Sequence, residues 1–393
     1  MPSSRLEGLH KLTPRERLRL LVNMGWIPAQ WAGEAGGEAG LLHHVSLQHL
    51  DLISENVVGV HSAPLSIVPN LVLNGRELLI PFCTEEPSVV AACSKAALLT
   101  RGSGGVTVTA YPRRALAQLL VRAPEGFVGL PGPSDLEQLR VSLATVAAKE
   151  HPRWDAAGGR VVALSARELN NMGSPFASLD ILFDPGDAMG ANLAAQLADL
   201  LAGLLNASSW TPICPIVSNH PTSRSFCASV RIAEAHLESP GVPGNAVANR
   251  IVDLSRWASC DPVRCTTHNK GVLNGVEALM RALNQDTRAV AASLFSWTLR
   301  NGHQQPLVEW HWEEGTLIGS FAASIPCGSV GGTGAFMPLT PLLHTMGGIR
   351  SAGDMEALAA AAGLLQNLGA LLALATDGIL AGHMKLHARK HGA

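Results

Sequence analysis

The sequence has little charge and few aromatic residues. Asp, Glu, Lys and Arg make up 15% of the 393 residues, and 29 basic against 31 acidic side chains leave a formal net charge of −2. A nearly neutral chain offers no large positive field to a phosphate backbone, so we expect no nucleic-acid partner. Because 47% of the residues are apolar, the chain can bury enough surface to fold, which excludes a disordered protein.

The N-terminus also lacks the basic stretch and apolar run of a signal peptide. One segment, Leu358 to Ala375, is apolar enough to be considered as a membrane span, but Gln366 and Asn367 lie at its centre. A central pair of amides in so short a run fits a helix buried in protein better than a span. We therefore expect a cytoplasmic protein with no membrane partner.

Cysteines with paired spacing are missing as well. The seven cysteines are scattered along the chain, which is typical of reduced thiols rather than of a disulfide framework. Cys260, Cys265 and His268 could form a zinc site only with further ligands of suitable spacing, and none accompanies them. His387 and His391 fit a basic, solvated tail. We expect no metal.

Hydrophobic periodicity and turn residues divide the chain into three parts. The first part combines a helix, two strand-like runs and a second helix, at 14–32, 57–60, 71–81 and 88–99. The turn dipeptide Asn74-Gly75 bends the longer of the two runs. The glycine-rich tetrapeptide Gly102–Gly105 is interpreted as the hinge into the second part.

The second part has the element order βαββαβ of ferredoxin-like domains. Its elements are predicted at 115–123, 134–149, 160–167, 176–184, 188–206 and 212–218. The third part is mixed again, with elements at 226–235, 244–258, 271–284, 286–300, 306–325 and 358–375. We therefore predict an α+β fold in which a large mixed α/β domain, residues 1–108 and 219–380, is interrupted by a small ferredoxin-like domain, residues 109–218.

The glycine fingerprint of a Rossmann dinucleotide site is absent, since Gly102–Thr107 lacks its third glycine and Gly331–Gly334 follows no clear strand. A different candidate for a phosphate-binding segment is Asp187–Asn192, which follows an apolar strand and begins an apolar helix. Asp187 suits the N-cap of that helix, and the small residues after it leave the first turn open to a ligand. The segment is either a phosphate grip or an ordinary capped helix.

Two further segments concentrate groups that carry chemistry. The segment Asp261–Gly271 is predicted as a polar loop just before a helix, and polar side chains are also common on ordinary surface loops. Glu85 and Glu86 stand at the end of an apolar strand, and the residue pattern does not decide which of them points inward.

Taken together, these segments resemble 3-hydroxy-3-methylglutaryl-CoA (HMG-CoA) reductase of the soluble, bacterial class II. The matching stretches occur in the family's order and spacing: Glu55–Gly59, Glu85–Ala92, Asp187–Asn192, Thr267–Gly271 with Asn274-Gly275, Gly363–Asn367 and Gly382–Met384. Each stretch alone is a weak signal, but all of them in register are specific. The resemblance implies an NAD(P)-dependent oxidoreductase that interconverts HMG-CoA with mevalonate and CoA by two hydride transfers, and at least a homodimer.

The resemblance implies four catalytic residues. The family's glutamate directly precedes a proline, so it is Glu86 rather than Glu85, and the lysine, aspartate and histidine fall on Lys270, Asp286 and His383. Lys270 would stabilise the negative charge that develops on the carbonyl oxygen. Glu86 would give a proton to the forming alcohol, and His383 would give one to the departing CoA thiolate.

The resemblance also implies the substrate and cofactor contacts. Ser88, Arg264 and Asn274 would bind the HMG group, whereas Glu55, Asn56 and Lys11 belong to the CoA side. The small domain of this family binds its dinucleotide without a Rossmann fold. The residues implied on the cofactor side are Asp187, Ala188, Met189, Gly190, Ala191, Asn192, Asn219 and Glu150.

The residue at position 150 bears on the choice of nucleotide. By alignment through Ala157–Gly159, Glu150 meets the adenine ribose, where a carboxylate accepts from ribose hydroxyls and repels a 2′-phosphate. NAD(H) is therefore favoured, with NADP(H) as the alternative.

The C-terminus departs from the family pattern. The chain stops ten residues after His383, whereas relatives of this class continue into a helical flap that closes over the site. Residues 381–393 are therefore interpreted as the remnant or start of that flap. Because closure positions the acid and excludes water, the alternative function is a catalytically weakened homologue that binds acyl-CoA without efficient turnover.

Overall fold

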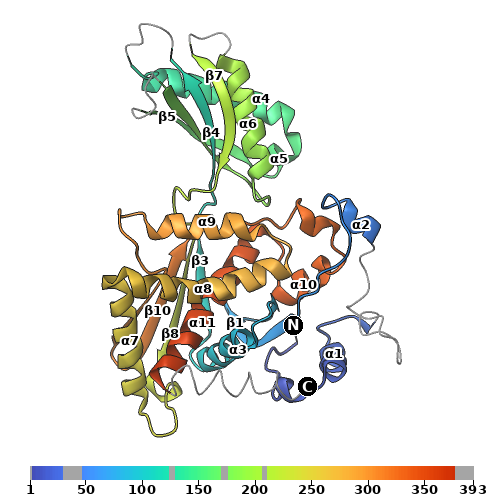
Figure 1. The fold of residues 1–393 in the computed structure, drawn as a ribbon, viewed down its shortest axis with the longest axis vertical. Helices are drawn as coiled ribbons and strands as arrows, with labels where there is room; N and C mark the ends of the chain where they lie inside the picture. The colour runs from blue at the N-terminus through green and yellow to red at the C-terminus, as the bar shows by residue number, and fades with distance from the viewer. Residues whose placement is uncertain (1, 30–46, 124–128, 170–175, 206–209, 377–393) are drawn as a thin grey trace.

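A computed structural model describes residues 2–29, 47–123, 129–169, 176–205 and 210–376 of the chain. These residues form two units, which we call the large unit and the small unit, each with its own sheet and its own hydrophobic core (Figure 1). The mixture of helices and two sheets confirms the predicted α+β class.

The large unit is built on a six-stranded sheet with the order β2-β1-β3-β8-β10-β9. Its strands are β1 (Leu65–Leu73), β2 (Arg76–Cys83), β3 (Val106–Ala110), β8 (Phe226–Ala233), β9 (Val308–Glu313) and β10 (Thr316–Ala323). Neighbouring strands are antiparallel except for β1 and β3. Strands from before and after the small unit share this sheet, so the large unit is completed only after the chain has crossed to the small unit and returned.

The predicted turn at Asn74-Gly75 is confirmed as the turn of a hairpin between β1 and β2. Both residues have positive φ, 49° and 75°, which is the geometry of the two-residue turn that matches the twist of paired strands. Leu73 and Arg76 are the first pair of the hairpin.

Helices surround the sheet of the large unit, and α11 is the most central of them. The principal ones are α3 (Pro87–Arg101), α7 (Gly244–Cys260), α8 (Pro262–Ala282), α9 (Thr287–Thr298), α10 (Thr340–Gly347) and α11 (Ala352–Ala375). Glycines bring α11 close to its neighbours: a Cβ on Gly275 of α8 would lie 2.5 Å from the carbonyl oxygen of Ala362. In the same way, a Cβ on Gly369 would lie 2.6 Å from the carbonyl oxygen of Ala92 in α3.

By length and composition alone, α11 could cross a membrane, but most of its side chains are buried inside the large unit. Gln366 and Asn367 are buried with the apolar residues, at 4% and 1% exposed. The prediction of a helix buried in protein is confirmed.

The small unit is an antiparallel sheet of order β5-β6-β4-β7, with helices on one face (Figure 1). Its elements are β4 (Ala115–Arg122), α4 (Pro133–Glu150), α5 (Pro152–Ala156), β5 (Arg160–Glu168), β6 (Phe176–Asp184), α6 (Ala191–Leu205) and β7 (Thr211–Ser218). Apart from the short α5, this is the predicted βαββαβ order. The remaining short helices among the described residues are η1 (Leu9–Lys11), α1 (Pro14–Asn23), α2 (Leu47–Asp51), η4 (Glu234–His236) and η5 (Thr333–Phe336).

Near the N-terminus the first predicted helix is confirmed from Pro14 but ends earlier than predicted, and the strand predicted at 57–60 is wrong. The first helix ends at Asn23, because Gly25 takes a left-handed φ of 77° and Trp26 and Ile27 turn into the core; positions 30–32 of the predicted helix lie outside the described residues. Residues 57–60 form no strand, and Val58 is 99% exposed. A β-prone sequence needs a neighbouring strand to pair with.

The hinge is not at Gly102–Gly105. This tetrapeptide connects α3 to β3, and Gly105 packs so closely on Val72 that a Cβ would lie 2.2 Å from its carbonyl oxygen. Since β3 belongs to the large sheet, the chain first crosses to the small unit between β3 and β4, at 111–114. It returns between β7 and β8, at 219–225.

The segment predicted as a polar loop, Asp261–Gly271, is helical instead. Asp261 is the N-cap of α8, with Oδ1 accepting from the N–H of Val263 at 2.9 Å, and Pro262 is the first helical residue. These are ordinary helix-start signals, and they outweigh the polarity of the segment. Its side chains are therefore divided between buried and exposed faces of one helix.

His268, on the buried face of α8, is 2% exposed. Its Nε2 lies 2.9 Å from the carbonyl oxygen of Val308 and 3.2 Å from Nδ2 of Asn367, while Nδ1 has no partner among the described residues. Burial lowers the pKa of His268 to about 4, although the hydrogen bond with Val308 opposes the shift. The ring is therefore neutral near neutral pH.

This pKa predicts a loss of stability in mild acid. The unfolded chain takes a proton on His268 below the ordinary pKa of 6.5, but the folded chain does so only below about 4. Stability from this group thus falls as the pH drops through that interval, by roughly 2 kcal/mol between about pH 7.5 and about pH 5. Urea unfolding at both pH values measures the loss. It should be smaller by that amount in His268→Gln, and an equal loss in both proteins would contradict the prediction.

Candidate active site

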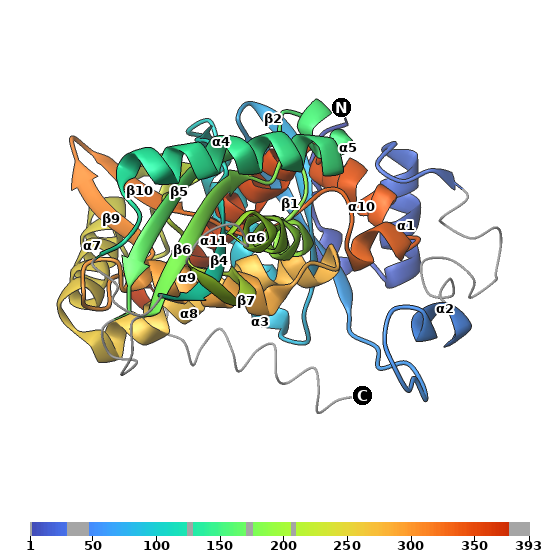
Figure 2. The same ribbon diagram turned by 90° about the horizontal axis from the view of Figure 1, so that it is seen from above.

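The two units meet at a crevice, with the small unit seated directly above the large one along the long axis of the molecule (Figures 1 and 2). The walls of the crevice are formed by the two chain crossings (111–114 and 219–225) and the loop between β6 and α6. Helix α9 and the segment after β10 complete them. Among the residues predicted for the cofactor, the crevice is lined by Met189, Gly190, Ala191 and Asn219.

The loop between β6 and α6 ends in a turn that requires glycine. Gly190 is buried with a φ of 103°, and an added Cβ would lie 3.0 Å from Cβ of Pro185 and 3.3 Å from Cβ of Ala115. Helix α6 therefore begins abruptly at Ala191, on the wall of the crevice. The first N–H groups of a helix have no carbonyl one turn earlier to accept them, so this helix start is suited to bind an anion.

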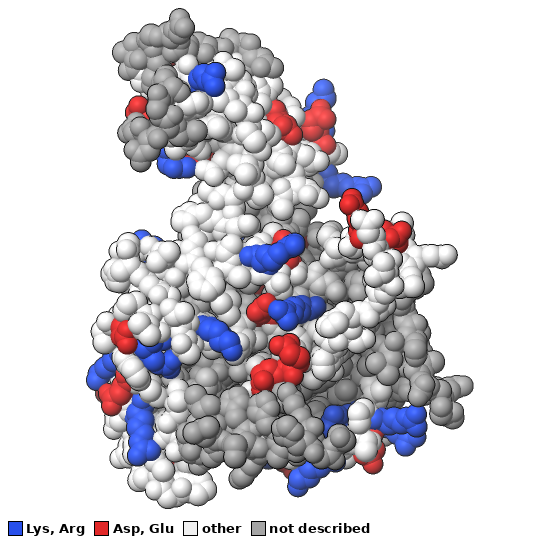
Figure 3. Space-filling view, viewed as in Figure 1, with Lys and Arg blue, Asp and Glu red and all other residues white. Residues whose placement is uncertain are grey.

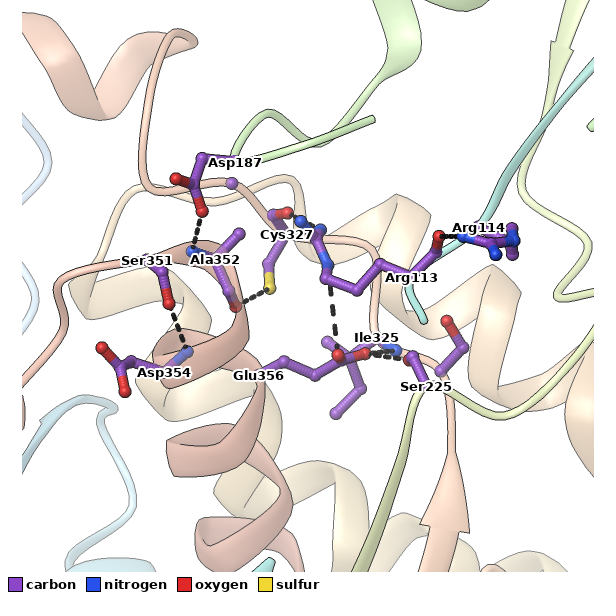
Figure 4. A network of polar contacts seen from close by, with 12 residues as sticks. Arg113, Arg114, Asp187, Ser225, Ile325, Cys327, Ser351, Ala352, Asp354 and Glu356 are labelled. Atoms are coloured by element: carbon purple, nitrogen blue, oxygen red, sulfur yellow. Dashed lines mark hydrogen bonds and ion pairs between the residues drawn. The ribbon is translucent and has the colours of Figure 1, made fainter. Parts of the chain in front are cut away.

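Asp187 is not the N-cap of α6, so that prediction is wrong. Its Oδ1 accepts from the N–H of Ala352 at 2.8 Å, at the start of α11 in the large unit (Figure 4). Its backbone carbonyl accepts from the N–H of Ser329 at 2.9 Å. The left-handed turn at Gly190 separates Asp187 from the first turn of α6, so the carboxylate joins the two units instead.

Arg113, in the first crossing, holds the same loop from the opposite side (Figure 4). It donates from Nη1 to the carbonyl of Gly186 at 2.5 Å and from Nη2 to the carbonyl of Cys327. Its Nε lies 4.0 Å from Oε2 of Glu356, a carboxylate buried on α11. The rigid guanidinium fork is suited to several acceptors at once, and here it joins the loop, the crossing and the large unit.

On the large unit, Glu86 and Ser88 lie together at the start of α3. Glu86 is the N-cap, with Oε1 accepting from the N–H of Ser88 at 3.2 Å, and Pro87 is the first helical residue. Proline disfavours a helical conformation in the residue before it, which fixes Glu86 in an extended conformation. Both Glu86 and Ser88 are half-buried.

Lys270 and Asn274 share one face of α8 with Glu277 and Arg281, because residues three or four apart lie on the same side of a helix. Lys270 is exposed and Asn274 is half-buried. At the far end of this face, Arg281 Nη1 lies 3.9 Å from Glu85 Oε2. Arg281 is eleven residues beyond Lys270, roughly 16 Å along the helix, so this contact places the Glu85–Glu86 turn at the Arg281 end of the face. Acidic and basic side chains alternate over this region in Figure 3.

Asp286 is the N-cap of α9. Its Oδ1 accepts from the N–H groups of Arg288 and Ala289, both at 3.1 Å, and lies 3.2 Å from Nε of Arg288. Burial raises the pKa of Asp286, but the Arg288 side chain and the two N–H groups outweigh burial and hold the pKa below its ordinary value. The carboxylate is therefore ionised near neutral pH.

The structure does not bring Arg264 to the Lys270 face. The two residues are six positions apart on α8, which places them on different sides of the helix. The Arg264 guanidinium lies 5.9 Å from the ring centre of Trp257, and burial lowers its pKa.

The other predicted residues have these positions. Lys11, Glu55, Asn56 and Asn192 are exposed, Ala188 is half-buried in the loop, and His383 lies outside the described residues. Glu150 is exposed at the end of α4. Just beyond it, Trp154 Nε1 donates to the carbonyl of Asp184 at 2.8 Å, so Glu150 is at the same end of the small unit as the loop at 185–190.

Several crevice residues were not predicted from the sequence. These are Arg113, Arg114, His220 and Ser293. Arg114 pairs with Asp184 at 3.2 Å, and Nδ1 of His220 lies 2.6 Å from Oγ of Ser296 in α9. The sequence signal that could have indicated them is the pair of adjacent arginines, Arg113 and Arg114, between two strands. No group of three or more His, Cys, Asp or Glu placed to hold a metal ion occurs in the described part of the chain.

The fold and the crevice define an enzyme class in which a ferredoxin-like unit, inserted into a larger mixed unit, forms one wall of a shared site. The family model for hydroxymethylglutaryl-coenzyme A reductase matches residues 30–388, so the chain belongs to this family, as its motifs predict.

Known relatives agree with this assignment. The chain is 33% identical to the 3-hydroxy-3-methylglutaryl-coenzyme A reductase of Archaeoglobus fulgidus, over 98% of this chain and 86% of that protein. It also resembles the class II enzyme of Streptococcus pneumoniae, whose NADPH-bound structure in open conformations is 30% identical with a TM-score of 0.83, covering 94% of this chain and 99% of that one. A further structure of the S. pneumoniae enzyme is 31% identical with a TM-score of 0.83, covering 98% and 90%. The comparisons support a reductase rather than a weakened homologue.

The loop geometry predicts opposite effects of two glycine substitutions at the ends of α6. Gly190→Ala forces a left-handed conformation and a contact with Pro185, so it should lower the free energy of unfolding by roughly 1–3 kcal/mol. Gly203→Ala, in open space on the same helix, should raise it by about 0.5–1 kcal/mol. Thermal unfolding of both variants measures these changes. Equal midpoints would show that the turn at Gly190 is not constrained.

Proposed function

We propose that the chain is an HMG-CoA reductase that interconverts HMG-CoA with mevalonate and CoA by two hydride transfers from or to a nicotinamide nucleotide. The observation that carries the proposal is the crevice between the two units, lined by the start of α6 at Met189, Gly190 and Ala191, in a chain of this family. The S. pneumoniae relative bound to NADPH supports a nicotinamide nucleotide here too.

The residues at the crevice fit such a nucleotide. Gly190 leaves the start of α6 bare, so the N–H groups of Ala191 and Asn192 are suited to hold a pyrophosphate, with Met189 and Asn219 beside them on the crevice wall. Ala188 and Asp187 would shape the loop. When bound, the nucleotide supplies the hydride. In the proposed division of the chain, residues 109–218 bind it, and residues 1–108 and 219–380 bind the substrate.

Lys270 would stabilise the negative charge that develops on the carbonyl oxygen of the thioester and then of the aldehyde. Asp286, ionised by its contacts with Arg288 and the start of α9, would provide the opposite charge near the ammonium. Glu86, fixed at the start of α3, would give a proton to the alcohol oxygen. His383 is proposed from the family resemblance alone as the acid for the CoA thiolate.

The remaining contacts follow the family pattern. Ser88, Arg264 and Asn274 are proposed for the HMG group, and Glu55, Asn56 and Lys11 for CoA. Arg264 and Lys270 lie on different sides of α8, so they would not contact the same HMG group from one face of the helix. We propose that Arg264 contacts an HMG group bound at the site of a second subunit. We propose a homodimer or higher homo-oligomer. All seven cysteines are free, which supports the cytoplasm as its location.

Replacement of Lys270 tests the proposed chemistry. Lys270→Ala should lower kcat for NADH oxidation with HMG-CoA by about 10²–10³-fold, because it removes the group that stabilises the oxyanion. The control is Lys95→Ala, which removes an exposed lysine from α3. Absorbance of NADH measures the rate. Activity that persists in Lys270→Ala, or that is absent from the unmodified protein with both NADH and NADPH, would contradict the proposed function.

We further propose that NADH is preferred over NADPH, because the Glu150 carboxylate at the crevice end of α4 would repel a 2′-phosphate. Glu150→Gln should then lower KM for NADPH by about tenfold and leave KM for NADH within a few-fold. Glu137→Gln, on the same helix, is the control. A preference for NADPH in the unmodified protein, with no response to Glu150→Gln, would refute this assignment.

A further inference from the structure

The two chain crossings between the units converge on one buried carboxylate. Ser225, in the second crossing, donates from Oγ to Oε1 of Glu356, and its backbone carbonyl accepts from the N–H of Tyr111 in the first crossing at 2.8 Å. The guanidinium of Arg224 also lies 4.6 Å from the ring centre of Tyr111. The crossings are therefore bound to each other as well as to Glu356.

Glu356 lies in the first turns of α11 with its side chain only 3% exposed. Besides Ser225, it accepts from the N–H of Ile325 at 2.8 Å, and Nε of Arg113 is 4.0 Å from its second oxygen (Figure 4). Burial raises the pKa of Glu356, while Arg113 and the two hydrogen bonds oppose the shift. Since a buried carboxylate is costly without its partners, the three contacts depend on one another.

The other side of Arg113 reaches the loop at the cofactor wall. Its donors bind the carbonyls of Gly186 and Cys327, and the carbonyl of Ala188 lies within 3.5 Å. Asp187 then returns to the N-terminus of α11 through the N–H of Ala352. The contacts form a closed ring, from α11 through Glu356 and Arg113 to the loop and back to α11.

We propose that Arg113 and Glu356 are positioning residues that fix the loop 186–190, and with it the small unit, against the N-terminus of α11. This inference rests on the proposed function, because the loop is the proposed nucleotide site. By fixing this loop, the pair determines the position and orientation of the nicotinamide nucleotide relative to the substrate side of the crevice. It acts through the loop and does not itself react.

Nucleotide affinity gives the first test. Arg113→Lys keeps the charge but loses the fork, and Glu356→Gln keeps an acceptor for Ser225 and Ile325 but loses the charge that faces Arg113. Both variants should raise the Kd of NADH, measured by calorimetry without turnover, by about tenfold. KM for HMG-CoA should change much less.

A matched control separates positioning from stability. Glu77 pairs with Arg101 at 2.9 Å entirely within the large unit, so Glu77→Gln removes the same kind of pair and should leave the NADH affinity unchanged. Ser225→Ala is a milder variant for the case in which the charge variants do not fold. It removes one hydrogen bond to Glu356 and should raise Kd in the same direction by a smaller factor.

The orientation of the units gives a second test that does not depend on activity. Cys214 on β7 and Cys260 on α7 are exposed cysteines, one in each unit, and can carry spin labels after Cys83 and Cys227 are replaced by serine. Labelled chains are diluted into unlabelled ones so that only distances within a chain are measured. The distance distribution should shift or broaden in Arg113→Lys and Glu356→Gln, but not in Glu77→Gln.

The outcomes separate this inference from the proposed function. Folded Arg113→Lys and Glu356→Gln variants with unchanged distances and unchanged NADH affinity would overturn the positioning role. If the unmodified protein binds neither NADH nor NADPH, the proposed function fails, whereas altered distances in the variants would still support the role of the pair in fixing the two units.

Discussion

The structure depends on how a chain that crosses twice between two separate cores is held at one junction. Each unit folds around its own apolar residues, so the hydrophobic effect alone leaves their relative orientation open. Directional polar contacts fix this orientation. Arg113 and Asp187 connect the loop at 186–190 to the large unit, and Glu356 binds both crossings. A crevice between two units can act as one site only if its walls keep a fixed distance.

The large unit provides the opposite wall through close helix packing. Gly275 and Gly369 allow α8 and α3 to lie directly against α11, and the buried amide of Asn367 accepts from Nε1 of Trp310 at 2.8 Å. One side of α8 is used in this packing and includes the buried polar residues His268 and Asn269, so Lys270 and Asn274 lie away from it. The position of Lys270 and Asn274 is thus a consequence of how the core is built.

Much of the fold was predictable because local signals agreed with the final packing. The βαββαβ order, the hairpin at Asn74-Gly75 and the buried apolar helix all follow from period and turn chemistry. The errors arose where a local pattern has two meanings: a polar run beginning with Asp261-Pro262 was a helix, and Asp187 before a helix was bound to a different one. The site residues came from the family resemblance, whereas Arg113, Glu356 and Ser225 are distant in sequence and meet only through the topology of the two crossings.

In the proposed function, a nicotinamide nucleotide binds the backbone of the loop at 186–190 and the first turn of α6. Hydrogen exchange of individual backbone amides, with and without saturating NADH, tests this most directly. Exchange should slow at residues 188–193 and at the crossing beside Arg113. Unchanged exchange at these amides, with protection appearing elsewhere in the chain, would contradict it.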